Sequence, residues 1–232
     1  MATKYNTPKI VTDNLVLYLD AANTKSYPTG SATWNDMMGG NDGTIEGATY
    51  VSSSPKHFSF DGSNDYMQFD QYDFGTAFSL FAFINPTSYG TIRTLFGNTA
   101  AGGSADGITC FLNGWNTSDN KMYIEYGNGS SGTTINSGTN TITNGVWQAV
   151  TFTYDKGNNT GSLYNNTTLF ASDTNVNIDS DLNRAFRMGR FGEGGNPYWY
   201  PGLIGVYMIY NRALTAAEVE QNFDALKGRY GL

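Results

Sequence analysis

The segment GNPYWYPG, residues 195–202, places three large aromatic side chains between two prolines and two glycines. Prolines spaced this closely exclude a helix, and a strand would send neighbouring side chains to opposite faces, so we predict a loop. Aromatic rings on a loop either anchor the loop to the core or present a flat apolar face to a ligand. The sequence leaves both interpretations open, and Trp199 is the ring that we expect to point outward.

A sugar is one ligand that such a surface suits. Its C–H faces pack on aromatic rings, and its hydroxyl groups form hydrogen bonds with Asn, Asp and Arg side chains. A further aromatic ring is offered by Trp115, in the segment FLNGWNTSDN. The candidate glycan-binding residues are Trp199, Tyr198, Tyr200, Trp115 and Arg190.

Groups for acid–base or nucleophilic catalysis are few. A glycoside hydrolase needs two carboxylates about 5 to 9.5 Å apart, one of them protonated. Glu218 and Glu220 lie two positions apart in a predicted helix and do not face each other. His57 is the only histidine, and no G-x-S-x-G motif accompanies it, so we expect it to be a solvated or hydrogen-bonded residue beside a strand. We therefore expect a protein without enzymatic activity, and the aspartates leave hydrolysis as an alternative.

Metal ligands are also scarce. Zinc needs several His or Cys ligands, and the chain has one histidine and one cysteine, so a zinc site is excluded. The single cysteine, Cys110, has no intrachain disulfide partner and is expected to be buried. Calcium takes about six to eight oxygen ligands, which the loops FDGSND (60–65) and GGNDGT (39–44) contain. Asx turns explain the same residues, so we expect no cofactor, with a structural calcium ion as the alternative.

The composition favours strands and argues against several partners. Of the 232 residues, 14% are charged, 15% are aromatic and 28 are glycine, which is typical of strands joined by turns. A net charge of −7 leaves little basic surface for phosphates, and Arg184, Arg187 and Arg190 would be divided between the two faces of a strand. The first twenty residues lack the apolar run of a signal peptide, and no segment is apolar enough to span a membrane. We expect synthesis in a reducing cytoplasm, no nucleic-acid partner and no membrane insertion.

Three segments have the pattern of buried strands. In FSLFAFIN (78–85), the even-numbered residues share one apolar face, while Phe81 and Phe83 share the other. VWQAVTFTYD (146–155) alternates in the same way. LIGVYMIY (203–210) is an almost continuous apolar run, which indicates a strand that is buried on both sides.

Turn and cap residues place a hairpin and a helix. SLYNNTTLF (162–170) predicts a hairpin that reverses at Asn165 and Asn166, because Asn tolerates a positive φ. LTAAEVEQNFDALKG predicts the one clear helix, with Thr215 and Glu218 forming a capping box and Gly228 ending it. About a dozen strands and one terminal helix are therefore expected.

Four segments in series carry a family resemblance. They are LVLYLDAANTKSYPTGSATWNDMMGGNDGTI, FSFDGSNDYMQF, NGVWQAVTFTYD and IYNRALTAAEVEQNFDALKGRYGL. Together they resemble the laminin-G-like, concanavalin A-like lectin/glucanase domains, and the closing segment is most similar to those of bacteriophage structural proteins. The resemblance extends from about residue 10 to the end of the chain. It implies two antiparallel sheets packed as a jelly-roll sandwich, with the helix sealing an edge or an end.

The resemblance also bears on the chemistry. Hydrolases of this type that retain configuration carry Glu-x-Asp-x-x-Glu or a close variant on one strand, and this chain lacks the pattern. Relatives often hold a structural calcium with an acidic residue from a late strand, where this chain has Gly205. In the family, the stretch before that strand is often aromatic for structural reasons.

We therefore expect an N-terminal arm, residues 1–10, and a single all-β domain, residues 11–232, folded as a two-sheet antiparallel jelly-roll sandwich. The resemblance implies a non-enzymatic component of a bacteriophage virion, displayed on the capsid or tail and binding host-surface glycans. Its expected partners are other virion proteins and host glycans, and the sequence is compatible with a homo-oligomer. The alternatives are a purely structural attachment module and a glycoside hydrolase.

Overall fold

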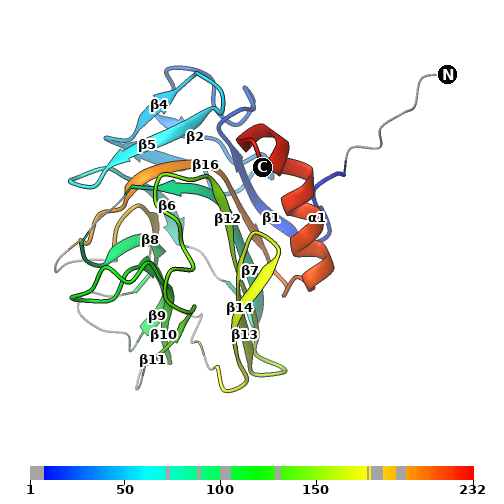
Figure 1. Ribbon diagram of the computed structural model, residues 1–232. Coiled ribbons are helices and arrows are strands. Elements are labelled where there is room, and N and C mark those ends of the chain that lie inside the picture. Colours follow the sequence, from blue (N-terminus) through cyan, green and yellow to red (C-terminus); the bar gives the residue numbers. More distant parts are fainter. Residues whose placement is uncertain are drawn as a thin grey trace.

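The computed structural model describes residues 8–71, 74–87, 90–99, 106–128, 132–176, 178, 185–191 and 197–232. In these ranges sixteen strands form two antiparallel sheets that pack face to face, and one α-helix lies against the outer side of one sheet (Figure 1). The predicted all-β sandwich with a short C-terminal helix is confirmed. No helix in the described ranges is both long and apolar enough to cross a lipid bilayer.

The first sheet, sheet A, holds the longest strands. Its order is β14-β13-β12-β7-β16-β5-β4, and β1 pairs with the second half of β16. The strands are β1 (Leu15–Asp20), β4 (Thr49–Val51), β5 (His57–Asp61), β7 (Ala77–Pro86), β12 (Gln148–Asp155), β13 (Thr160–Asn165), β14 (Thr168–Asp173) and β16 (Pro201–Tyr210).

The second sheet, sheet B, has the order β11-β10-β9-β8-β15-β6-β3-β2. Because β15 lies between β8 and β6, three segments far apart in the sequence become neighbours. The strands are β2 (Thr33–Trp34), β3 (Gly43–Glu46), β6 (Tyr66–Gln71), β8 (Arg93–Gly97), β9 (Asp106–Leu112), β10 (Met122–Asn128), β11 (Gly132–Asn136) and β15 (Ala185–Met188).

Strand alternation separates the core from the outer faces. The even-numbered apolar residues of β7 belong to the main core between the sheets, whereas Phe81 and Phe83 belong to a second core on the other face of sheet A. Cys110 is fully buried in the main core, and burial raises the pKa of its thiol. The predicted division of β7 and the predicted burial of Cys110 are confirmed.

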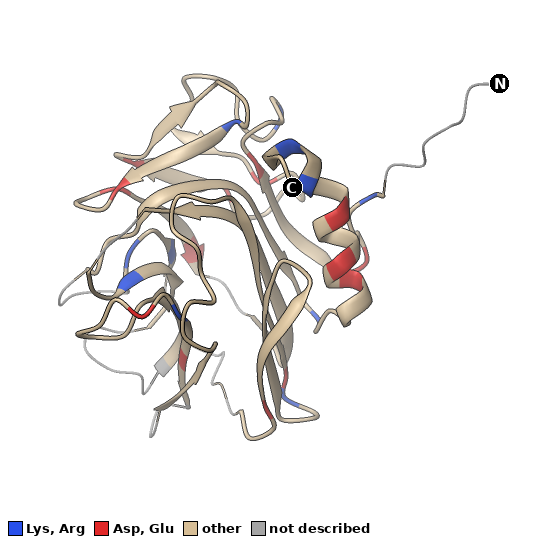
Figure 2. Ribbon diagram, viewed as in Figure 1, with Lys and Arg blue, Asp and Glu red and all other residues tan. Residues whose placement is uncertain are grey.

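The second core lies between sheet A and helix α1 (Ala216–Leu226), with the following 3-10 turn, η1 (Lys227–Tyr230). Val219 and Leu226 of the helix are buried against the sheet, and the Tyr230 ring stacks on Phe83 at 4.3 Å. The helix therefore covers a sheet face, and the expectation that it seals an edge or an end is wrong. The helix carries several acidic residues, while the strands of both sheets carry few charged ones (Figure 2).

The helix begins as predicted, but its end differs: the α-helical part ends at Leu226 and a 3-10 turn continues to Tyr230. Thr215 and Glu218 form the capping box. Gly228 does not end the helix, because the backbone continues as η1 and the left-handed residue is Gly231, with φ 75°. The apolar contact of Tyr230 with sheet A stabilises this extra turn.

The described part of the predicted N-terminal arm lies against the helix. Gln221 Nε2 donates to the Lys9 carbonyl oxygen at 2.8 Å, and Val11 N donates to Asn222 Oδ1 at 2.8 Å. The first seven residues of the arm lie outside the described residues.

Two smaller predictions have mixed outcomes. The hairpin between β13 and β14 reverses at Asn166 and Thr167 rather than at Asn165, and Asn166 has a φ of 53°. His57 is buried rather than solvated: its Nδ1 lies 2.5 Å from the Pro55 carbonyl oxygen, and its ring packs against Trp147.

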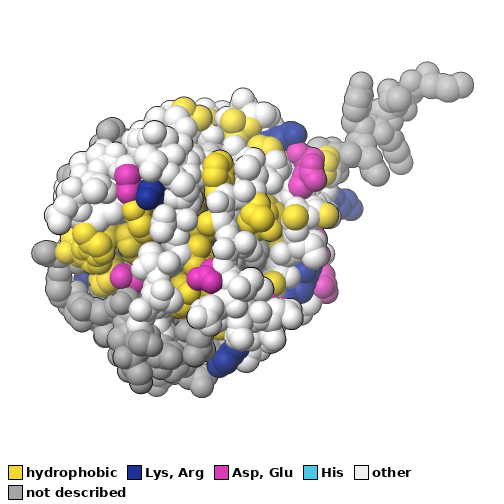
Figure 3. Space-filling model, turned by 60° about the horizontal axis from the view of Figure 1, so that its bottom comes forward, with side chains coloured by type: hydrophobic (Ala, Val, Ile, Leu, Met, Phe, Trp, Pro, Cys, Tyr) yellow, Lys and Arg dark blue, Asp and Glu magenta, His cyan; other side chains and the backbone are white. Residues whose placement is uncertain are grey.

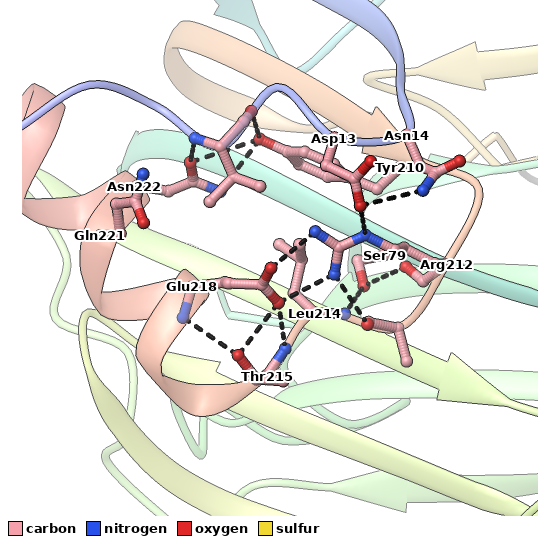
Figure 4. A network of polar contacts seen from close by, with 12 residues as sticks. Asp13, Asn14, Ser79, Tyr210, Arg212, Leu214, Thr215, Glu218, Gln221 and Asn222 are labelled. Atoms are coloured by element: carbon pink, nitrogen blue, oxygen red, sulfur yellow. Dashed lines mark hydrogen bonds and ion pairs between the residues drawn. The ribbon is translucent and has the colours of Figure 1, made fainter.

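An ion-pair network fixes the start of the helix against the end of β16 (Figure 4). The Arg212 guanidinium donates to both carboxylate oxygens of Glu218, at 2.8 and 2.6 Å, and its Nε lies 3.1 Å from Asp13 Oδ2. Glu218 also accepts from the Thr215 backbone N–H at 2.9 Å. The Arg212 hydrogen bonds, together with those of Thr215, outweigh partial burial and lower the pKa of Glu218 to about 2.

This pKa predicts a stability change in acid. A carboxyl group whose pKa falls on folding contributes stability above its unfolded pKa of 4.5, and that contribution is lost as the pH falls toward 2. Because the pair is partly exposed and screened by solvent, we expect Glu218→Gln to cost about 1 kcal/mol at pH 6. Urea unfolding at pH 6, 4 and 2.5 tests this: the difference between wild type and variant should shrink toward zero at pH 2.5. A pH-independent difference would contradict the assignment.

Candidate functional site

Five aromatic rings form a continuous group, which we call the aromatic platform, on the outer side of sheet B. Two of them, Phe111 and Phe191, are buried, so they support the exposed rings rather than contact a ligand. The group lies at one end of β9 and β10 and includes rings from the segments that follow β15 and precede β16. Its β9 member, Phe111, alternates with Cys110 and Leu112, which face the core. The platform residues are Phe111, Trp115, Tyr123, Phe191 and Tyr198.

The base of the platform is a cross-strand stack. Phe111 and Tyr123 are directly opposed on β9 and β10, with ring centroids 5.0 Å apart and planes 6° apart. Tyr123 Oη donates to Asp119 Oδ2 at 2.6 Å. Burial and this hydrogen bond raise the pKa of Tyr123 to about 12. Burial disfavours the Asp119 carboxylate, but hydrogen bonds from Tyr123, Lys121 and Gly114 lower its pKa. The ring is thus neutral and held in place near neutral pH.

Trp115 is the exposed member of the platform. Its side chain is 46% exposed, and its ring meets Tyr198 edge-on at 5.1 Å and Phe111 at 6.0 Å. Trp199, which we expected to be the outward ring of the loop, is partly buried, as Tyr198 is. Trp115 offers the largest apolar surface of the candidate residues to a ligand.

Tyr198 is held in a left-handed backbone conformation, with φ 43°. This conformation is costly for a bulky residue and is found where the surrounding structure imposes it. Here Thr94 N donates to the Tyr198 carbonyl oxygen at 2.8 Å, and Phe191 N donates to the Pro197 carbonyl oxygen at 2.7 Å. These two bonds tie the loop to β8 and to the segment after β15, and the Tyr198 ring contacts Trp115.

Arg190 and Trp199 lie together beside the platform. The Arg190 guanidinium carbon is 5.0 Å from the Trp199 ring centroid and 5.1 Å from that of Tyr66. The two rings are themselves 5.8 Å apart. Cation–π contacts of this kind hold both rings in fixed orientations. Arg190 therefore covers part of the Trp199 ring, and the two residues border the platform at its side.

Tyr200 does not belong to the surface. It is fully buried in the main core, where it packs edge-on against Phe60 at 6.0 Å. Burial raises the pKa of its hydroxyl group well above the usual value. Its predicted glycan-binding role is wrong, because its side chain has no exposed area with which to contact a ligand. The GNPYWYPG loop thus combines both interpretations: Tyr200 anchors it, and Tyr198 takes part in the platform.

Sequence reasoning missed Phe111, Tyr123 and Phe191 as members of the platform, and Tyr66 as the ring that contacts Arg190 beside it. The alternation in β9 is a usable signal, since an aromatic residue between two core residues must face outward. Nothing local in the sequence indicates that these rings meet. Of the three arginines considered together, Arg187 is buried on β15, Arg190 lies at the platform, and Arg184 is outside the described residues.

The described part of sheet B does not bring carboxylates together in the way that hydrolysis needs. Glu125, on β10, is half-buried, and burial raises its pKa. Its neighbours across the sheet are Thr109 on β9 and Thr134 on β11. A raised pKa is typical of a general acid, but the second carboxylate is not among these neighbours.

The two loops considered for calcium use their carboxylates internally. In the GGNDGT loop, Asp42 accepts from Asp36 N at 2.8 Å. The Asp36 carboxylate, which precedes this loop, accepts four backbone N–H bonds, from Gly40 and Asn41 of the loop and from Tyr18 and Met38. In the FDGSND loop, Asp65 accepts from Asp61 N at 2.8 Å, and Asp61 accepts from Ser63 N at 2.7 Å. Within the described chain, no group of three or more His, Cys, Asp or Glu side chains is positioned to hold a metal ion.

These bonds predict that calcium does not stabilise the fold. Incubation with excess EDTA should leave the melting temperature within about 1 °C of the untreated protein, because a ligand that is not bound contributes no stability. Differential scanning calorimetry with and without added calcium measures this directly. A fall of several degrees on chelation, reversed by calcium, would establish the calcium site instead.

The two-sheet sandwich and its surface aromatic rings define a β-sandwich of the lectin-like class. The family model described as "Concanavalin A-like lectin/glucanases superfamily" matches residues 61–220, which is more than half of the chain. The chain belongs to this superfamily. No curated protein matches the sequence.

Solved structures with the same fold include clostridial toxin domains. The binding domain of Paraclostridial Mosquitocidal Protein 1 is 19% identical to this chain, with a TM-score of 0.68. The match covers 90% of this chain and 52% of the chain of that domain. The receptor-binding domain of the botulinum neurotoxin C/D mosaic serotype is 12% identical, with a TM-score of 0.69. This match covers 92% of the present chain and 52% of the chain of that domain. The chain thus spans about half the length of these domains, and at this identity the likeness shows the fold alone.

Proposed function

We propose that this protein is a non-enzymatic glycan-binding module and that the aromatic platform is its binding surface. The observation that carries the proposal is the exposed Trp115 ring, which is fixed by Tyr198 and Phe111 at 5.1 and 6.0 Å. Rings that are already ordered lose little conformational entropy when a ligand packs against them. Asp119 and Lys121, beside Tyr123, provide polar groups for sugar hydroxyls.

The similar structures support this proposal at the level of the fold. One is the binding domain of botulinum neurotoxin DC in complex with SialylT. Another belongs to botulinum neurotoxin type C, whose cell entry is described as dependent upon interaction with two ganglioside molecules. Each is about twice as long as the part that matches. They support the use of this sandwich in receptor-binding proteins. The support for a binding surface in this chain comes from the platform residues.

Trp115→Ala is expected to lower glycan affinity about tenfold, which corresponds to the roughly 1.5 kcal/mol of one aromatic stacking contact. The melting temperature should change little, because the ring is 46% exposed. The measurement is retention on a glycan array, followed by affinity electrophoresis of the glycans retained.

The matched control is Phe170→Ala, which removes an aromatic ring that is 43% exposed on β14, in the other sheet. It should leave retention unchanged. Equal loss in both variants, or no retention of any glycan by the wild type, would refute the platform as a sugar-binding surface.

We propose further that the module is displayed on a bacteriophage particle, on the capsid or the tail. The support is the resemblance of its closing segment, IYNRALTAAEVEQNFDALKGRYGL, to phage structural proteins. Display in many copies would raise the effective concentration of weak sites on one particle. Mass spectrometry of purified particles tests this placement, which fails if the protein is found only in the soluble lysate.

One observation favours the purely structural alternative. Leu169 and Phe170, on the edge strand β14, are 51% and 43% exposed. Figure 3 shows hydrophobic side chains in separate patches among mostly uncharged polar surface, and exposed apolar patches often mark protein contacts. If the alternative holds, Phe170→Ala should release the protein from particles while Trp115→Ala should not.

A further inference from the structure

The platform offers essentially one ring to a ligand. Trp115 is 46% exposed, whereas Phe111 and Phe191 are 1% and 3% exposed. Tyr123 and Tyr198 are partly buried. The energy of apolar contact grows with the area that the ligand covers, and most of the open area here belongs to a single indole, which is about as large as one pyranose ring. The open surface therefore matches one sugar residue rather than a row of them.

The neighbouring rings do not continue the plane of Trp115. Its plane is turned by 84° from that of Tyr198 and by 68° from that of Phe191. The angle to Phe111 is 54°. The parallel pair in the platform, Phe111 and Tyr123, has its rings stacked on each other rather than side by side as one flat floor. Within the platform, a sugar on Trp115 thus has no coplanar ring beside it for the next sugar.

Backbone bonds hold the two loops in this arrangement. The loop that carries Trp115 is closed at its base, where Asn113 N donates to the Lys121 carbonyl oxygen at 3.0 Å. The Tyr198 carbonyl oxygen accepts from Thr94 N at 2.8 Å. Because the Trp115 ring also packs edge-on against Tyr198 at 5.1 Å, the two rings are fixed at a corner and do not turn freely into one plane.

The polar groups next to Trp115 are also local. Asn116, Thr117 and Ser118 follow it directly, and all three are exposed and uncharged. Amide and hydroxyl groups both donate and accept hydrogen bonds, as sugar hydroxyls do. Since they lie within three positions of the indole, these groups suit the hydroxyls of the sugar that stacks on it, rather than those of residues further along a chain.

We propose that the protein recognises a single sugar residue, at the end or at a branch of a soluble glycan, and does not bind the flat faces of crystalline cellulose or chitin. In those faces successive sugar rings lie in one plane, so a surface that binds them needs coplanar aromatic rings. The inference rests on the proposed glycan-binding function and adds to it the class of glycan.

The first test is titration of the full chain with the methyl glycosides of glucose, galactose, mannose, N-acetylglucosamine, fucose and rhamnose. Cellohexaose, chitohexaose and mannohexaose are titrated beside them. At least one methyl glycoside should bind within about threefold of the affinity of the tightest glycan from the array. Each hexasaccharide should bind at most about threefold tighter than the methyl glycoside of its own residue, because its other residues make no stacking contact.

Variants assign the binding to the indole. Trp115→Ala should weaken methyl glycoside binding about tenfold, as it does glycan binding. Trp115→Phe keeps a smaller ring in place and should lose less than Trp115→Ala. Phe170→Ala, which removes an exposed ring from the other sheet, should leave the affinity unchanged.

The second test is sedimentation with microcrystalline cellulose and with crystalline chitin, where the protein should stay in the supernatant. If a hexasaccharide exceeds the threefold margin, or if a crystalline polysaccharide retains the wild type and not Trp115→Ala, the single-residue proposal is wrong and the platform proposal stands. The same holds if no methyl glycoside binds while the array retains glycans through Trp115. If the wild type retains no glycan and binds no methyl glycoside, both proposals are wrong.

Discussion

Asp36→Ala is expected to destabilise the protein by about 3 kcal/mol, because it removes the acceptor of four backbone N–H groups at once. Two of these bonds, from Tyr18 N on β1 and Met38 N, measure 2.9 Å, and Asp36 is 6% exposed. An orphaned buried N–H costs roughly 1–3 kcal/mol, while the N–H groups nearer the surface can turn to water. The loop joining β2 to β3 would then lose the Asp36 bond to β1 and keep only the bond from Met37 N to the Tyr18 carbonyl oxygen, at 3.0 Å, on that residue.

Chemical denaturation measures this effect, and Asp42→Ala is the matched control. Asp42 accepts a single bond, from Asp36 N at 2.8 Å, and is exposed. It should cost about 1 kcal/mol. If both variants lose a similar amount of unfolding free energy, the four hydrogen bonds of the Asp36 carboxylate are not what holds the loop. Added calcium should rescue neither variant if hydrogen bonds alone organise this loop.

Gly205→Ala is expected to destabilise the protein by about 2–3 kcal/mol, although it adds only one methyl group. A Cβ at this position would lie 2.8 Å from Cε1 and 2.9 Å from Cζ of Tyr230. The Tyr230 ring cannot retreat freely, because it stacks on Phe83 at 4.3 Å and contacts Trp147 at 4.6 Å. Relief of the clash would require the η1 turn to move off sheet A.

A double-mutant cycle tests this explanation. Gly205→Ala should cost much less in a Tyr230→Ala background, because the space is then empty. Gly228→Ala is the control: a Cβ there meets nothing within 4 Å, so the change should be nearly neutral. If Gly205→Ala costs the same with and without the Tyr230 ring, the close approach is not the cause. The packing also explains why this chain has no acidic side chain at 205, since the Tyr230 ring occupies that space.

Much of the fold was predictable because its signals are local. The alternation in β7 assigns Phe81 and Phe83 to one face wherever the strand pairs, since side chains alternate with period two. The capping box of Thr215 and Glu218 needs only residues three positions apart. The end of the same helix was predicted wrongly, because it depends on Tyr230 packing against a distant strand.

The candidate site was predictable only in its residue types. Trp115 and Tyr198 were identifiable as aromatic residues in loops, but their contact at 5.1 Å depends on β15 pairing with β8. The same pairing decides that Tyr198 faces the platform while Tyr200 enters the core. Neighbouring residues in a loop give no sequence signal for this choice.

The sequence by itself determined the strands, the capped helix, the scarcity of catalytic and metal-binding groups, and the presence of aromatic residues in loops. Only the tertiary structure decided which rings meet and which of them are buried. The physical reason is the distance along the chain over which each interaction acts. Periodicity and capping act over a few residues, whereas a surface site is assembled by strand pairings between segments up to about a hundred residues apart in sequence.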